Sequence, residues 1–125
     1  MPDADADRYT IDRYLTLFSA REREAWLDLF AEAATMEDPV GTPLKRGREE
    51  IGAFFDQSHG SADSVELVAD GPPVVIGSEA AFRFKVRPVL GGAPFELSAI
   101  DVMTFDDEAR ILTQRAFVDF AMLAP

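Results

Sequence analysis

The chain has 125 residues, of which 47% are hydrophobic, and this is enough for one domain, residues 1–125, around a single core. Its 12 Lys and Arg residues against 23 Asp and Glu residues give a net charge of −11, which argues against partners such as nucleic acid or an anionic membrane. The absence of cysteine excludes disulfides, thiol catalysis and sulfur-ligated metals.

The N-terminal segment MPDADADRYT lacks the basic and apolar regions of a signal peptide, and no later apolar run approaches the length of a membrane span. We therefore expect a soluble, cytoplasmic protein whose partners are neutral or small molecules. Asp3, Asp5 and Asp7 are expected to belong to an irregular terminus.

Three helices are predicted in the first half of the chain. The first, from Asp7 to Phe18, repeats apolar residues at helical spacing and places Tyr14 on its buried face. The second is predicted from about Arg21 to Ala34, with a core-facing stripe of Ala25, Trp26, Leu29, Phe30 and Ala33. The third is predicted to begin at Gly47 and to end near Ser58, burying Ile51, Phe54 and Phe55.

Beyond the third helix the apolar period shortens from about 3.6 residues to about 2, which indicates strands. One strand is predicted over residues 80–87, a second over 95–105 after a turn at Gly91 and Gly92, and a last one from Ile111 to about Ala121. Helices followed by strands predict an α+β fold. We expect a curved, mostly antiparallel sheet whose concave side is covered by the three helices, so that a hydrophobic pocket is closed.

Asp38 is the first candidate catalytic residue, because Pro39 restricts its backbone at the end of an apolar run. A carboxylate on such backbone can point in one fixed direction. The alternative is that the Asp-Pro pair only begins a turn, which is its commoner role.

Asp101 is the second candidate, because the alternation over residues 97–105 places it on the apolar face. Burying an unpaired carboxylate there would cost several kcal/mol, so we expect Asp101 to keep its proton and act as a hydrogen-bond donor. The alternatives are a bulge at Asp101 or an ion pair with an inward-facing arginine.

Tyr14 is a possible second donor, although a buried tyrosine is more often an ordinary core residue. One base and two neutral donors are the groups that enolisation needs, because removing a proton beside a carbonyl places negative charge on its oxygen. His59 is the only histidine and lies in the polar segment QSHGSADS, so we expect it to be exposed and predict neither a metal site nor a Ser-His-Asp arrangement.

The segments DRYLTLF, LFAEAATMEDPVGTP, RGREEIGAFF and AIDVMTFDDEARILTQRAF, in this order along the chain, closely resemble the Δ5-3-ketosteroid isomerase family. That family belongs to the NTF2-like, SnoaL-like group of cone-shaped folds. The resemblance implies a homodimer, no cofactor, and migration of a steroid double bond from the β,γ to the α,β position of a 3-ketone through a dienolate. By motif, Asp38 resembles the base that moves the proton from C4 to C6, and Tyr14 and Asp101 resemble the two oxyanion donors.

We expect a pocket for a small, hydrophobic, steroid-like substrate, with a lining that includes Phe30, Phe55, Phe82, Phe84, Val86, Gln114 and Val118. Phe30 and Phe55 stand where some relatives carry tyrosines, Val118 stands where relatives carry a large aromatic residue, and Gln114 would make the lining more polar. Ile100 and Val102 are expected on the outer face of the sheet, where they favour a homodimer interface.

Two alternatives to a steroid Δ-isomerase stay open at this point. The first is an enzyme of the same fold with other chemistry, such as a hydrolase, cyclase or dehydratase, because this fold hosts many functions. The second is a non-catalytic module that binds hydrophobic small molecules or a partner chain.

Overall fold

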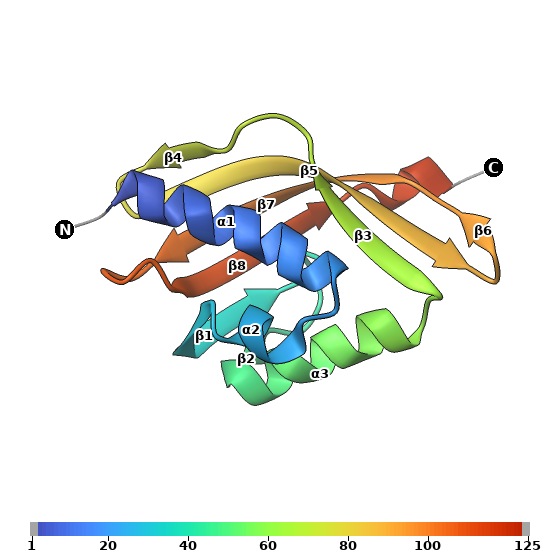
Figure 1. Ribbon diagram of the computed structural model, residues 1–125, viewed down its shortest axis with the longest axis horizontal. Coiled ribbons are helices and arrows are strands. Elements are labelled where there is room, and N and C mark those ends of the chain that lie inside the picture. Colours follow the sequence, from blue (N-terminus) through green and yellow to red (C-terminus); the bar gives the residue numbers. More distant parts are fainter. Residues whose placement is uncertain (1–2, 124–125) are drawn as a thin grey trace.

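The computed structural model describes residues 3–123, which form a curled sheet with the helices on one side of it (Figure 1). The sheet has the strand order β2 (Lys45–Arg46), β1 (Phe30–Glu37), β8 (Ile111–Val118), β7 (Leu97–Phe105), β5 (Glu79–Leu90) and β3 (Ser64–Ala69). Two short strands, β4 (Val74–Ile76) and β6 (Ala93–Pro94), also pair with β5. Of the strand pairs in the described residues, only β1 and β8 run parallel, so the expected α+β fold with a mostly antiparallel sheet is confirmed.

The helices lie over the face of the sheet that holds the core. Helix α1 (Ala4–Ser19) crosses in front of the long strands, and α2 (Arg23–Leu27) and α3 (Gly47–Gly60) lie near β1 (Figure 1). A short 3-10 helix, η1 (Phe120–Leu123), follows β8. Across residues 3–123, none of the helices is both long enough and apolar enough to cross a membrane.

A cluster of aromatic rings joins the helices to the sheet. Trp26 is fully buried, and its ring centroid lies 4.8 Å from that of Phe30, 5.2 Å from that of Phe55 and 5.6 Å from that of Tyr14. Tilted and edge-on ring pairs of this kind add about 0.5–1.5 kcal/mol each to the burial of their apolar area. The cluster therefore fixes the position of Tyr14 on α1.

The predicted second helix is wrong in its second half. Helix α2 ends at Leu27, and the chain from Phe30 to Glu37 forms strand β1, which pairs in parallel with β8. A shift in the pairing register between Phe30 and Thr35 breaks the alternation of buried residues, and Ala33 is exposed. The alanine-rich sequence FAEAA favours a helix locally, but pairing with a strand from the other end of the chain overrides that preference.

Several local expectations are also corrected. Residues 1 and 2 lie outside the described part of the chain, but from Ala4 onward the chain is helix and not an irregular terminus. The Asp3 side chain accepts hydrogen bonds from the backbone nitrogens of Asp5 and Ala6, and Asp7 is buried. Strand β3, with the sequence SVELVA, was not predicted. Strand β7 begins at Leu97 and β8 ends at Val118, so both are shorter than the strands predicted over residues 95–105 and from Ile111 to about Ala121.

The prediction that His59 is exposed is wrong, because α3 continues past Ser58 and places His59 one turn beyond Phe55 on the buried face. The ring nitrogen Nε2 donates a hydrogen bond to the carbonyl oxygen of Phe18 at 2.9 Å. The ring centroids of Phe18 and Phe55 lie 4.5 and 4.6 Å from that of His59. Burial between these rings lowers the pKa of His59 below its ordinary value of 6.5.

This burial predicts a loss of stability in mild acid. Above pH 6.5 the imidazole is neutral in both the folded and the unfolded chain, and its contribution is complete. As the pH falls below 6.5, the unfolded chain takes up a proton that the folded chain resists, so the free energy of unfolding decreases. Urea denaturation of the parent and of His59→Gln at pH 7.5 and pH 5.5 checks this, because the loss between the two pH values should be smaller in the variant.

Candidate active site

Asp38 lies directly after β1, on a loop that is held at several points. Its bond to Pro39 is cis. The backbone nitrogen of Val40 donates to the carbonyl oxygen of Ala116 at 2.8 Å, and the Thr42 hydroxyl donates to the carbonyl oxygen of Pro39 at 2.7 Å. These bonds attach the loop to β8 and to itself, so the carboxyl group of Asp38 has a defined direction.

Asp101 lies in the middle of β7, where it is fully buried. Regular pairing with Phe82 on one side and Ala116 on the other shows that no bulge occurs at Asp101. Among residues 3–123, the structure shows no ion pair between Asp101 and a Lys or Arg side chain. Burial, and after it the nearby charge of Asp38, raises the pKa of Asp101 well above its ordinary range, which favours the neutral acid.

Tyr14 on α1 faces the same place from the helical layer and is 2% exposed. Its hydroxyl forms a hydrogen bond with Asp101. Burial, followed by the charges of Asp101 and Asp38, raises the pKa of Tyr14 well above 10.0, so the phenol keeps its proton at neutral pH.

A single amide nitrogen joins the three predicted groups. The Nε2 atom of Gln114 on β8 lies 3.2 Å from Oδ2 of Asp38, 3.2 Å from Oδ2 of Asp101 and 3.4 Å from the hydroxyl oxygen of Tyr14. Residues far apart in the sequence thus meet at one point, where α1, β7, β8 and the end of β1 come together. Two carboxyl groups and a phenol thus lie within hydrogen-bond reach of a shared atom.

The pKa of Asp38 is raised by burial, while the hydrogen bond from Gln114 and the positive charge of Lys45 lower it in part. The ammonium group of Lys45 lies 3.5 Å from the backbone carbonyl oxygen of Asp38. A carboxylate with a raised pKa is a stronger base than a solvated one, and this suits a group that removes a proton from carbon.

A cavity of about 540 Å³ opens beside Tyr14 and Asp38, a volume in the range of small-molecule sites. Most of its lining is apolar: Phe18, Phe54, Val65, Leu67, Phe84, Val86, Leu97, Ala116, Val118 and Phe120. Polar groups lie along the part formed by α3 and the chain on either side of it: Thr42, Lys45, Gln57, Ser58 and Ser61. The expected hydrophobic pocket is therefore present under the helices.

Some of the predicted lining residues face this cavity and others lie behind it. Phe84, Val86 and Val118 line it, whereas four buried residues do not: Phe30, Phe55, Phe82 and Gln114. Gln114 lies in the site itself, and the rings of Phe30 and Phe82 lie beside Tyr14, with centroids 6.3 and 6.4 Å from that of Tyr14. Sequence reasoning missed Val65 and Leu67 because strand β3 was not predicted, although their spacing of two residues was the available signal.

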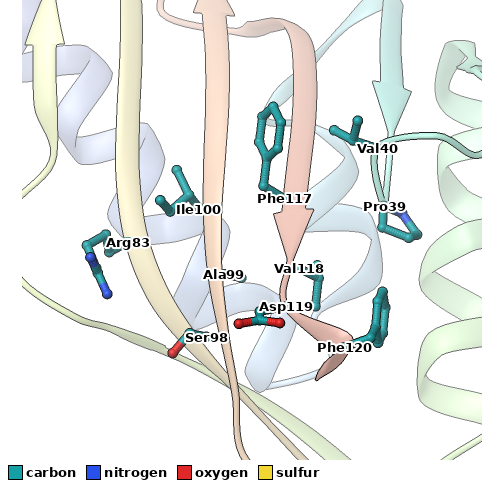
Figure 2. A pocket seen from close by; sticks show the side chains of 10 residues that line it. All are labelled: Pro39, Val40, Arg83, Ser98, Ala99, Ile100, Phe117, Val118, Asp119 and Phe120. Atoms are coloured by element: carbon teal, nitrogen blue, oxygen red, sulfur yellow. The ribbon is translucent and has the colours of Figure 1, made fainter. Parts of the chain in front are cut away.

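A second cavity, of about 560 Å³, lies on the outer face of the sheet (Figure 2). The side chains of Ile100 on β7 and Phe117 on β8 stand side by side in it, and they are 39% and 44% exposed. Arg83 and Asp119 also border this outer groove. Pro39, directly after Asp38, lines both cavities, so the loop that carries the candidate base separates them.

Comparisons with known proteins agree with the family resemblance of the sequence motifs. A family model described as a SnoaL-like domain matches residues 11–113. A steroid Delta-isomerase of Nocardioides simplex is 38% identical over 107 residues, which cover 86% of this chain and 85% of that protein, and this confirms the resemblance found in the motifs.

A solved structure of SalBIII, described as an epoxide hydrolase/cyclase-like enzyme with a role in pyran ring formation in the polyether salinomycin, superposes with a TM-score of 0.86. The superposition covers 97% of this chain and 96% of the SalBIII chain. At 22% sequence identity, this similarity supports the fold alone. The cone-shaped NTF2-like fold predicted from the sequence is confirmed by these matches. The chain belongs to the family of SnoaL-like domains.

Proposed function

We propose that the protein is a steroid Δ-isomerase, which converts a Δ5-3-ketosteroid to the conjugated Δ4-3-ketosteroid. The observation that carries the proposal is the convergence of Asp38, Tyr14 and Asp101 around one amide nitrogen beside an apolar cavity. The 38% identity to a steroid Delta-isomerase supports it.

In the first step the carboxylate of Asp38 removes a proton from C4. The electron pair of the broken C–H bond forms a C3–C4 double bond, and the C3 carbonyl electrons move to its oxygen. Tyr14, which lines the cavity, donates its hydroxyl proton in a hydrogen bond to that oxygen. Asp101 lies beneath the lining and strengthens Tyr14 as a donor through their shared hydrogen bond.

In the second step the dienolate collapses. The oxygen electrons reform the C3 carbonyl, and the electron pair of the C3–C4 double bond forms a C4–C5 double bond. The pair of the C5–C6 double bond then forms a C–H bond at C6 with the proton from the carboxyl group of Asp38. The base is thereby regenerated, and the product differs from the substrate only in the position of one double bond. One side chain thus serves as base and then as acid, and the half-buried position of Asp38 limits loss of the proton to water.

Turnover of 5-androstene-3,17-dione tests the proposal, because its conjugated product absorbs in the ultraviolet where the substrate does not. We expect absorbance to rise in proportion to protein concentration. Binding of the steroid without any change in absorbance would instead identify a module that binds apolar ligands. Neither binding nor turnover would indicate another substrate class for this cavity.

We also propose that the chain forms a homodimer through the outer face of the sheet. Ile100 and Phe117 expose apolar surface there, and Arg83 and Asp119 provide opposite charges at the edge of the same groove. A two-fold interface brings a surface against its own copy, so a patch that contains both charges can complement itself.

Sedimentation at micromolar concentration should give a dimer for the parent and a monomer for Phe117→Glu, because the new carboxylate would be buried in the interface. Leu90→Glu is a suitable control, since Leu90 is also exposed but lies outside the groove. A monomeric parent protein would refute the interface.

A further inference from the structure

Gln114 lies at the centre of the site, but it has no role in the reaction steps proposed above. Its side chain is 1% exposed, and it is absent from the lining of the cavity. A direct contact with the substrate is therefore a poor explanation for this amide.

The hydrogen bonds around Gln114 can be counted. An amide nitrogen carries two hydrogens, but three oxygen atoms lie within reach of Nε2. The oxygens of Asp38 and Asp101 are both at 3.2 Å, and the hydroxyl oxygen of Tyr14 is farther away at 3.4 Å. The two hydrogens are best used on the two carboxyl groups, and the hydroxyl oxygen of Tyr14 then keeps its lone pairs for the hydrogen bond that it shares with Asp101.

The orientation of the amide follows from the same contacts. With Nε2 toward the acids, a donor faces the carboxylate of Asp38. The reversed amide would place the carbonyl oxygen of Gln114 against that carboxylate, where two acceptors would repel each other. Among residues 3–123 the buried Oε1 atom of Gln114 has no hydrogen-bond partner, so the contacts of Nε2 with the acids decide the orientation of the side chain.

We propose that Gln114 is a positioning residue that holds the carboxylate of Asp38 and the carboxyl group of Asp101 in one array, and thereby leaves the hydroxyl oxygen of Tyr14 for its hydrogen bond with Asp101. This role rests on the proposed isomerase reaction for its catalytic meaning, but the array itself is a property of the protein without substrate.

The proposal has a direct consequence for the basicity of Asp38. Four groups face its carboxyl from the surrounding elements: Tyr14 on α1, Lys45 on β2, Asp101 on β7 and Gln114 on β8. Burial raises the pKa of Asp38, and the hydrogen bond from Gln114 is the first of the influences that lower it. Loss of this donor should therefore raise the pKa of Asp38.

Gln114→Met tests this, because methionine has a similar length but no donor. Carboxyl-carbon NMR during a pH titration measures the pKa of Asp38. We expect this pKa to rise by about one pH unit, which is the effect of losing one hydrogen bond to a charged group. Gln114→Asn keeps the amide but is one methylene shorter, so its nitrogen falls short of the acids and the pKa should rise in this variant too. Gln57→Met is the matched control: it removes a glutamine from the cavity wall that has no bond to either acid, and should leave the pKa of Asp38 in place.

Kinetics separate positioning from substrate contact. At a pH where Asp38 is ionised in both proteins, Gln114→Met should lower kcat about tenfold and leave KM within about twofold, because the side chain lies behind the cavity wall. A raised KM with unchanged kcat would make Gln114 a substrate contact and overturn the proposal.

An unchanged pKa of Asp38 in both Gln114 variants would overturn it as well, even if the parent protein isomerises steroids. Conversely, the pKa of Asp38 could rise in the Gln114 variants although the parent protein does not isomerise steroids. This result would refute the proposed function but support the array around Gln114. Denaturation midpoints of the same variants identify any general loss of structure, which by itself does not move the pKa of one carboxyl group in a fixed direction.

Discussion

Asp38→Asn is expected to lose isomerase activity by roughly 10³-fold or more while it binds an apolar steroid about as tightly as the parent protein. The amide has nearly the same shape as the carboxylate, but it cannot accept a proton from C4. It can still accept the hydrogen bond that Gln114 donates at 3.2 Å, so the surrounding array should persist. The loss therefore belongs to the chemical step and should be a loss of kcat.

Steady-state turnover and fluorescence titration with a steroid inhibitor measure the two quantities separately. Asp12→Asn is the matched control, because Asp12 is exposed on α1 outside the active-site cavity. Activity of Asp38→Asn within about tenfold of the parent, a difference of only ~1.4 kcal/mol in the barrier, would show that another group removes the proton.

Asp101→Leu is expected to lose roughly 10²-fold in kcat, a loss on the scale of a removed oxyanion donor, because Tyr14 loses the partner that strengthens its hydrogen bond to the oxyanion. Asp101→Asn should keep substantial activity. The reason is that a neutral Asp101 acts through a hydrogen that it donates, and asparagine also carries such a hydrogen. Leucine fills the apolar site but leaves Tyr14 without its partner.

The comparison of turnover and denaturation midpoint in both Asp101 variants distinguishes this role from a structural one. An ionised Asp101 held by a buried cation would make Asp101→Asn unstable by several kcal/mol, because the cation would lose its partner. The structure places no such cation beside Asp101 among the described residues, so Asp101→Asn should be close to the parent in stability. An unstable and inactive Asp101→Asn would contradict the neutral donor.

The periodicity of apolar residues in the sequence was sufficient to predict that Tyr14 and Asp101 face the core. Helical spacing put Tyr14 on the inner face of α1, and strict alternation put Asp101 on the inner face of β7, where both residues are buried. These predictions succeeded because both elements are long, regular and packed on one side, so burial repeats with the period of the backbone. The restriction that Pro39 places on Asp38 was likewise visible in the local sequence.

Only the tertiary structure decided the features that depend on partners distant in the chain. The segment FAEAA became part of β1 because β8 pairs with it, and His59 became buried because Phe18 and Phe55 enclose it. Gln114 could be placed on β8 from the sequence, but its position between two acids 13 and 76 residues away could not. Local propensity is a weak preference of less than about 1 kcal/mol per residue. Strand pairing, burial and hydrogen bonds between distant segments outweigh it, and they form only when the whole sheet curls around the helices.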